Sequence, residues 1–237
     1  MAKLIALAQV DGDRFESGGA EGGVWQTFFL RPPPGSVEPQ AFLVEYRPGR
    51  TLVTHFHDSD EFQLVVAGGG TLGRHALRPG TLHFARAYTP YGPIVAGESG
   101  LAFLTLRARR DSCGPQKLPE RRAELDRHAD RQPWQATDEL PPSSQPGVVV
   151  PLSRLRGPAG LLACCTDLPA GESWQAPPTA DEGRFVVLVT GSLREDAQET
   201  RAPALAFVRA GEPSPEAVAG SDGARVLCLD FPRPAAP

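Results

Sequence analysis

The sequence has few lysines, few aromatic residues and no long hydrophobic run. Of its 24 basic residues only Lys3 and Lys117 are lysines, and with 28 acidic residues the net charge is −4. Without a basic block, nothing favours nucleic-acid binding. No apolar run approaches the about 20 residues of a membrane-spanning helix, and the first residues lack a signal-peptide cleavage site. We therefore expect a cytoplasmic protein that binds neither nucleic acid nor a membrane.

Cysteine is also scarce. The four cysteines are Cys113, Cys164, Cys165 and Cys228, and no CxxC pair is present. This spacing excludes the short motifs that hold zinc or carry out thioredoxin-like redox chemistry. Because sequence neighbours rarely pair with each other, we expect free and mostly buried thiols in a reducing compartment.

Glycine and proline are abundant, with 25 of each, which indicates many short elements joined by turns. Strand-like runs separated by turn residues, GGG at 68–70 among them, recur along the chain and predict an all-β protein of sandwich or barrel type. These runs are 24–30, 41–46, 51–57, 61–67, 81–87 and 101–108, followed by 147–152, 161–168, 184–193, 204–210 and 224–231.

The two halves of the chain repeat each other. EFQLVVAG at 61–68 aligns with RFVVLVTG at 184–191, and FARAYTPY at 84–91 aligns with FVRAGEPS at 207–214, both at an offset of 123. One shared offset over separate blocks indicates duplication. We therefore predict an N-terminal barrel over 1–110, a linker with one short helix over 111–147, and a C-terminal barrel over 148–237.

The stretch GRTLVTHFHDSDEFQLVVAG, residues 49–68, holds the candidate site. In a strand, His55 and His57 share one face, and an antiparallel return after the DSD turn would bring Glu61 beside them. Two imidazoles and a carboxylate with open positions suit Fe(II), and also Mn, Ni, Zn or Co. Gln63 follows on the face of Glu61, where it could orient a ligand or only satisfy a polar contact inside the barrel.

The spacing Gly49, five residues, His55-x-His57, three residues, Glu61, six residues, Gly68 resembles the first motif of the cupin superfamily. The resemblance implies antiparallel jelly-roll barrels, here two in one chain as in a bicupin. It also implies a divalent metal ion inside the N-terminal barrel, and self-association as a homodimer is an expectation of the same kind.

The second cupin motif supplies a third histidine, but GTLHFARAYTPY at 80–91 has Tyr91 there. Tyr91 could bind the metal as phenolate, donate a hydrogen bond to a bound ligand, or leave water on the metal. A neutral phenol is the default near pH 7, which favours the last two. In the second copy no usual ligand set remains, so that barrel is predicted to be metal-free. The aligned residues are Pro177, Thr179, Arg184 and Ser214.

The resemblance implies a metal-dependent enzyme acting on a small organic molecule, with His55, His57 and Glu61 holding the metal and Tyr91 and Gln63 serving the reaction. The three-ligand set favours a dioxygenase-like reaction over an isomerase. The alternative is a non-catalytic sensory or structural cupin that binds a metal or a small ligand. A serine hydrolase is disfavoured because no GxSxG elbow is present.

Overall fold

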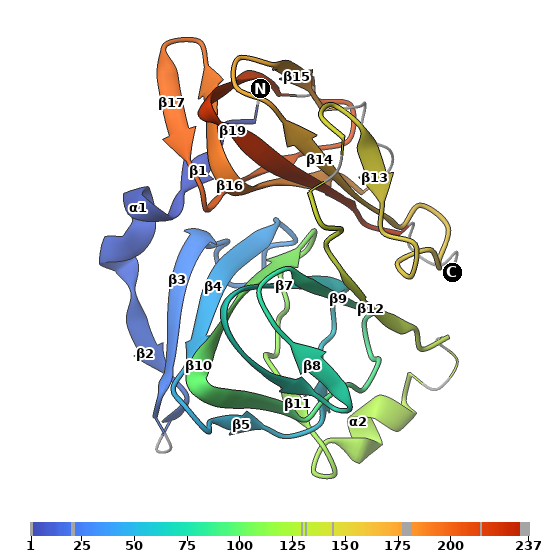
Figure 1. Ribbon diagram of the computed structural model, residues 1–237. Coiled ribbons are helices and arrows are strands. Elements are labelled where there is room, and N and C mark those ends of the chain that lie inside the picture. Colours follow the sequence, from blue (N-terminus) through green and yellow to red (C-terminus); the bar gives the residue numbers. More distant parts are fainter. Residues whose placement is uncertain are drawn as a thin grey trace. The chain divides into compact units, whose positions relative to one another are not determined.

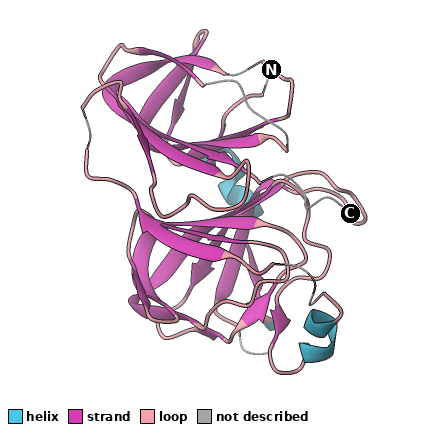
Figure 2. Ribbon diagram, turned by 90° about the vertical axis from the view of Figure 1, so that its right-hand side faces the viewer, coloured by secondary structure: helices cyan, strands magenta, loops and turns pink. Residues whose placement is uncertain are grey.

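The computed structural model describes residues 2–19, 22–128, 130, 132–143, 145–176, 182–213 and 215–232 (Figure 1). The chain divides into two compact units, one formed by residues 13–139 and the other by residues 1–12 together with 140–237. Both are built from antiparallel strands, and helices are few and short (Figure 2). No helix among the described residues is long and apolar enough to cross a membrane.

The N-terminal unit is a nine-stranded antiparallel sheet in the order β12-β9-β7-β10-β4-β3-β2, with β5 paired to β10 and β8 paired to β7. A separate two-stranded ladder joins β6 to β11. The elements are β2 (Phe15–Ser17), β3 (Val24–Leu30), β4 (Gln40–Tyr46), β5 (Thr51–Leu52), β6 (His55–Phe56), β7 (Glu61–Leu72), β8 (His75–Leu77), β9 (Thr81–Ala85), β10 (Ile94–Arg107), β11 (Gln116–Lys117), α2 (Arg122–Asp126) and β12 (Gln135–Glu139).

The C-terminal unit has an eight-stranded antiparallel sheet in the order β1-β18-β16-β19-β14-β13, with β15 paired to β19 and β17 paired to β16. Its elements are β1 (Ile5–Ala6), α1 (Leu7–Val10), β13 (Val149–Pro151), β14 (Leu162–Leu168), β15 (Ser173–Gln175), β16 (Arg184–Glu195), β17 (Gln198–Arg201), β18 (Ala204–Val208) and β19 (Glu216–Asp230), and a 3-10 turn follows α1 at Asp11–Asp13.

The predicted repeat appears in the bounds of the strands. Strands β7 and β16 begin at 61 and 184, and β9 and β18 begin at 81 and 204, so both pairs lie 123 residues apart. Each of the long strands β7 and β16 lies between its unit's other two main strands, β9 and β10 or β18 and β19. Corresponding positions in the two units can therefore be compared directly.

The edges of the two units differ from the predicted ranges. Strand β1 pairs with β18, so the first residues of the chain complete the sheet of the C-terminal unit. Strand β12, expected within the linker, pairs with β9 of the N-terminal unit, while helix α2 does lie in the predicted linker segment. Both additions give an otherwise open sheet edge a hydrogen-bonding partner, and turn composition alone does not reveal such distant pairing.

The glycine run at 68–70, expected as a turn, lies inside β7, so this part of the prediction is wrong. The chain reverses later, where Leu72 pairs with His75. A Cβ atom on Gly70 would lie 2.0 Å from the Val95 carbonyl oxygen, and one on Gly68, whose φ is +69°, would lie 2.3 Å from that of Gly100. The glycines therefore let β7 and β10 approach each other through an irregular stretch of their ladder.

Candidate metal and ligand site

The segment that carries the two histidines is less regular than predicted. The strand expected over 51–57 breaks into β5 and β6, and His55 exchanges backbone hydrogen bonds with Tyr91 at 3.1 and 3.0 Å. On its other side β6 pairs with β11, where Lys117 lies opposite His55. The expected hairpin between the histidine strand and the Glu61 strand is therefore wrong, although the side chains still meet.

The imidazoles of His55 and His57 are buried, and their ring centroids lie 5.2 Å apart. His55 Nδ1 lies 2.9 Å from the Val53 carbonyl oxygen, and His57 Nδ1 lies 2.6 Å from Asp111 Oδ2. Because a carbonyl and a carboxylate oxygen can only accept, both Nδ1 atoms carry the proton. In a neutral ring, Nε2 is then the nitrogen that carries the lone pair, and the Nε2 of His55 has no hydrogen-bond partner among the described residues.

The neutral state of His55 follows from its surroundings. Burial, and secondarily the neighbouring His57, lower the pKa of His55 to about 4. Desolvation penalises the imidazolium form. An uncharged imidazole is the form that can bind a metal ion.

Glu61 is completely buried and accepts hydrogen bonds on both oxygens. Arg107 donates to Oε2 through Nε at 2.9 Å and Nη2 at 2.7 Å, while Oε1 accepts from the Tyr91 hydroxyl and, at 3.2 Å, from Gln63 Nε2. Burial alone would raise the pKa of Glu61, but His57, Arg107 and these hydrogen bonds outweigh it and lower the pKa to about 2. Glu61 is therefore ionised, and its Oε1 lies 3.9 Å from His57 Nε2.

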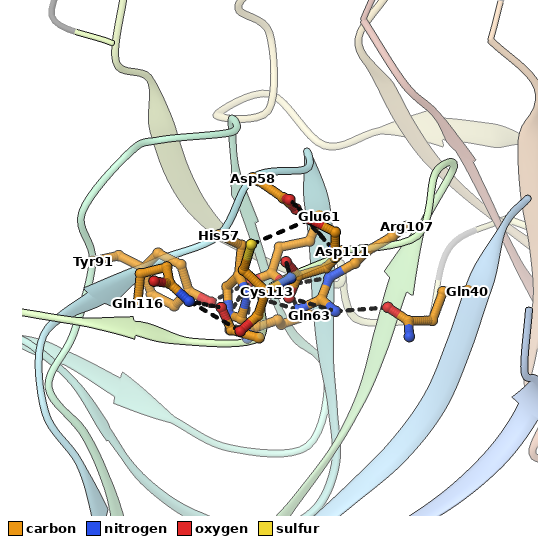
Figure 3. A network of polar contacts seen from close by, with 12 residues as sticks. Gln40, His57, Asp58, Glu61, Gln63, Tyr91, Arg107, Asp111, Cys113 and Gln116 are labelled. Atoms are coloured by element: carbon orange, nitrogen blue, oxygen red, sulfur yellow. Dashed lines mark hydrogen bonds and ion pairs between the residues drawn. The ribbon is translucent and has the colours of Figure 1, made fainter. Parts of the chain in front are cut away.

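Arg107 organises the polar network shown in Figure 3. Besides binding Glu61, its Nη1 donates to Gln40 Oε1 at 2.8 Å and lies 3.3 Å from Asp111 Oδ2. Arg107 Nη2 also lies 3.2 Å from His57 Nδ1. The contact between His57 Nδ1 and Asp111 is shorter, so we place the proton of Nδ1 in that contact. Neither Arg107 nor Asp111 was identified from the sequence. The sequence does contain a signal for both: Arg107 is a charged residue at the end of an apolar strand, and the acidic Asp111 follows four positions later.

Gln63 and Tyr91 adjoin this network. Gln63 Nε2 lies 3.2 Å from the Tyr91 hydroxyl oxygen, and Gln63 pairs across the sheet with His83. Burial and the nearby Glu61 carboxylate raise the pKa of Tyr91 well above 10, so the phenol is neutral. Tyr88, in the turn before Tyr91, has φ of +57°, a left-handed conformation usually left to glycine.

Beside these groups lies a cavity of about 560 Å³. His55, His57, Gln63 and Arg107 form part of its wall, whereas Glu61 and Tyr91 are not in its lining. The rest of the wall combines an apolar part, formed by Phe28, Phe42, Val44, Tyr46, Ile94 and Phe103, with polar groups that include Arg50, Asp111 and Lys117. This size and composition are typical of sites for small molecules.

The arrangement permits a metal ion but does not present a finished set of ligands. Among the described residues, no three His, Cys, Asp or Glu side chains form a ready metal site. His57 Nε2 nevertheless lies 3.9 Å from Glu61 Oε1, the two imidazole rings adjoin each other, and the three side chains are held by contacts to Val53, Asp111 and Arg107. Such outer contacts are typical of metal ligands. These residues fit a divalent ion if the Tyr91 hydroxyl turns away from Oε1.

The corresponding part of the C-terminal unit differs. Of the four aligned residues, Pro177, Thr179 and Ser214 lie outside the described residues. Arg184, at the position of Glu61, is buried and binds Asp230, with Nη2 2.6 Å from Oδ2. A guanidinium group cannot bind a cation.

Comparisons with known proteins show the fold. No family model and no curated protein sequence matches the chain. A mutant of oxalate decarboxylase from Bacillus subtilis is similar at a TM-score of 0.62 and 13% identity, over 98% of this chain and 78% of that one. The bacterial pirin YhhW from Escherichia coli, in complex with nickel(II), is similar at 0.62 and 12%, over 99% and 100%.

A study of the Mn(II) centres of the Bacillus subtilis oxalate decarboxylase provides a third structure, with a TM-score of 0.59 at 14% identity, over 98% of this chain and 78% of that one. Oxalate decarboxylase and pirin both have cupin folds. The predicted fold class, two antiparallel jelly-roll barrels of cupin type, is therefore confirmed.

Proposed function

We propose that the N-terminal barrel is a metal-dependent enzyme site for a small organic molecule, with His55, His57 and Glu61 holding a divalent ion. The carrying observation is the orientation of the two imidazoles. Each Nδ1 lies against an acceptor, which leaves Nε2 as the nitrogen that can bind an ion when the ring is neutral, and both histidines line the cavity. Nickel(II) and Mn(II) in structures of the same fold support an ion of this class.

The other side chains have separate roles in this proposal. A divalent ion held there would supply Lewis-acid or redox chemistry toward an oxygen-bearing substrate. Gln63 lies on the cavity wall, where its amide can orient the substrate. The neutral Tyr91 hydroxyl donates to Glu61 Oε1, and in this proposal it turns toward another acceptor when an ion binds Oε1. Arg107 keeps Oε2 of Glu61 in place.

Among reaction classes we favour a dioxygenase-like reaction over an isomerase, because three protein ligands leave several positions open on an octahedral ion. The aromatic wall of Phe28, Phe42 and Phe103 favours a substrate with an apolar body. Oxygen consumption by the iron-loaded protein against small phenols, diketones and thiols tests this step.

Elemental analysis after purification from metal-replete medium tests the site. We expect about one divalent ion per chain in the wild type and in a His75→Ala control, which changes an exposed histidine on β8. His55→Ala and His57→Ala should lose the ion, because each removes one of three donors. Wild-type metal content in folded His57→Ala protein would refute the assignment.

A specific observation also favours a second candidate, a non-catalytic barrel that binds a small ligand. Glu61 is already satisfied by donors from Arg107, Tyr91 and Gln63, and a metal ion would have to displace one of them. A metal-free wild type that binds small organic molecules in the 560 Å³ cavity would establish this second function in place of the first.

A further inference from the structure

The C-terminal unit contains a pair of thiols that no step of the proposed function uses. Cys164 on β14 and Cys228 on β19 lie directly opposite each other in antiparallel register. Both thiols are free, and each residue is only 4% exposed. Because directly opposite residues of an antiparallel pair project to the same face of the sheet, the two thiols lie side by side.

The position of this pair corresponds to the wall of the N-terminal cavity. There, Gln63 pairs with Thr105, which in turn pairs with Phe42, and all three line the 560 Å³ cavity. The register positions that correspond to them in the C-terminal unit are held by Val186, Cys228 and Cys164. The second barrel therefore has two thiol groups close to the position where the first barrel has the polar side chains of Gln63 and Thr105.

A cavity of about 260 Å³ opens beside the thiols. Cys164 and Cys228 both line it, together with Thr166, Glu172 and Trp174. The hydrogen bond from Cys228 and the charge of Arg184 lower the pKa of Cys164, whereas that of Cys228 is raised well above its ordinary value. One thiol is thus the first to ionise, and the other stabilises it by donation.

We propose that Cys164 and Cys228 bind a soft monovalent cation, Cu(I), as a two-coordinate dithiolate. Soft thiolate ligands select Cu(I). Among the described residues no third His, Cys, Asp or Glu joins them in a metal-binding group, which disfavours ions that require four or more ligands. Binding forms two Cu–S bonds and releases both thiol protons to solvent.

Anaerobic Cu(I) titration against a chromogenic Cu(I) chelator tests the proposal, in a Cys113→Ser background that removes the exposed thiol. We expect one equivalent to bind, with a thiolate-to-metal ultraviolet band and quenching of Trp174, which lines the same cavity. Cys164→Ser and Cys228→Ser should each weaken binding by about 100-fold, or about 2.7 kcal/mol.

Cys165→Ala is the matched control, because Cys165 is adjacent in sequence but alternates to the other face of β14. It should bind Cu(I) like its parent. Equal affinity in the parent and in folded Cys228→Ser protein, or no bound equivalent in the parent, would overturn the proposal. The His57→Ala protein should retain this Cu(I) site, which separates the outcome from that of the N-terminal metal.

Discussion

Replacing Arg107 with methionine tests whether one buried ion pair sets the stability of the N-terminal unit. The guanidinium donates twice to Glu61 and once to Gln40, and Glu61 has no exposed surface. Removing one partner of a buried ion pair costs about 3–5 kcal/mol, because the remaining charge is left uncompensated. We therefore expect Arg107→Met to lower the free energy of unfolding by that amount at pH 7.

The pKa of Glu61 gives the scale of the whole network around this carboxylate. Its displacement from the ordinary 4.5 to about 2 is worth about 3 kcal/mol at about 1.4 kcal/mol per unit. Because the folded-state pKa is depressed, this stabilisation is present above the unfolded-state pKa and is lost as the pH falls toward 2. This figure is the net effect of burial, His57, Arg107 and Tyr91, so Arg107 supplies only part of it.

The assay is urea unfolding followed by tryptophan fluorescence in a Trp174→Phe background. Trp25 and Trp134, the other two tryptophans, both belong to the N-terminal unit, so the signal then reports on that unit alone. The double variant Glu61→Met with Arg107→Met should recover most of the loss, since well-packed apolar replacement of a buried pair is often neutral. A loss below about 1 kcal/mol in Arg107→Met, or a double variant as unstable as the single one, would refute the reasoning.

Three further changes have defined outcomes. Gly70→Ala places a Cβ atom 2.0 Å from the Val95 carbonyl oxygen and should cost at least about 1–3 kcal/mol in the same unfolding assay; Gly97→Ala in the same ladder, whose Cβ would meet nothing closer than 3.1 Å, should cost less. Asp111→Asn removes the charged acceptor of His57 Nδ1 and should weaken metal binding about 10–100-fold by competition with a chelator; unchanged affinity would contradict the role given to Asp111. A chelator should lower the melting temperature of the wild type, since binding at 100 times Kd stabilises by about 2.7 kcal/mol, and should leave His57→Ala unshifted.

Local pattern predicted the elements of the molecule better than their partners. The run beginning at Glu61 and the run at 24–30 start where β7 and β3 start, because alternation and turn residues are visible within a few positions. Spacing likewise identified His55, His57 and Glu61 as neighbours. Arg107 contacts Glu61 from 46 residues away, and that contact depends on the register of β10 against β7, which an irregular glycine-containing ladder sets.

The comparison of the two units separates the scaffold from the chemistry. Glu61–Arg107 and Arg184–Asp230 are ion pairs at corresponding positions, each spanning 46 residues, with their charges exchanged. The fold therefore accommodates a buried ion pair at this position whichever of the two strands carries the acid. Neither arrangement of the charges by itself implies a metal ion. Two features distinguish the N-terminal barrel. The Nδ1 atoms of His55 and His57 are hydrogen-bonded to Val53 and Asp111, and the strand position beside them carries the carboxylate of Glu61, which attracts cations. In the C-terminal barrel the guanidinium takes that place, and two thiols line a separate cavity, which is why we propose different classes of ion for the two barrels.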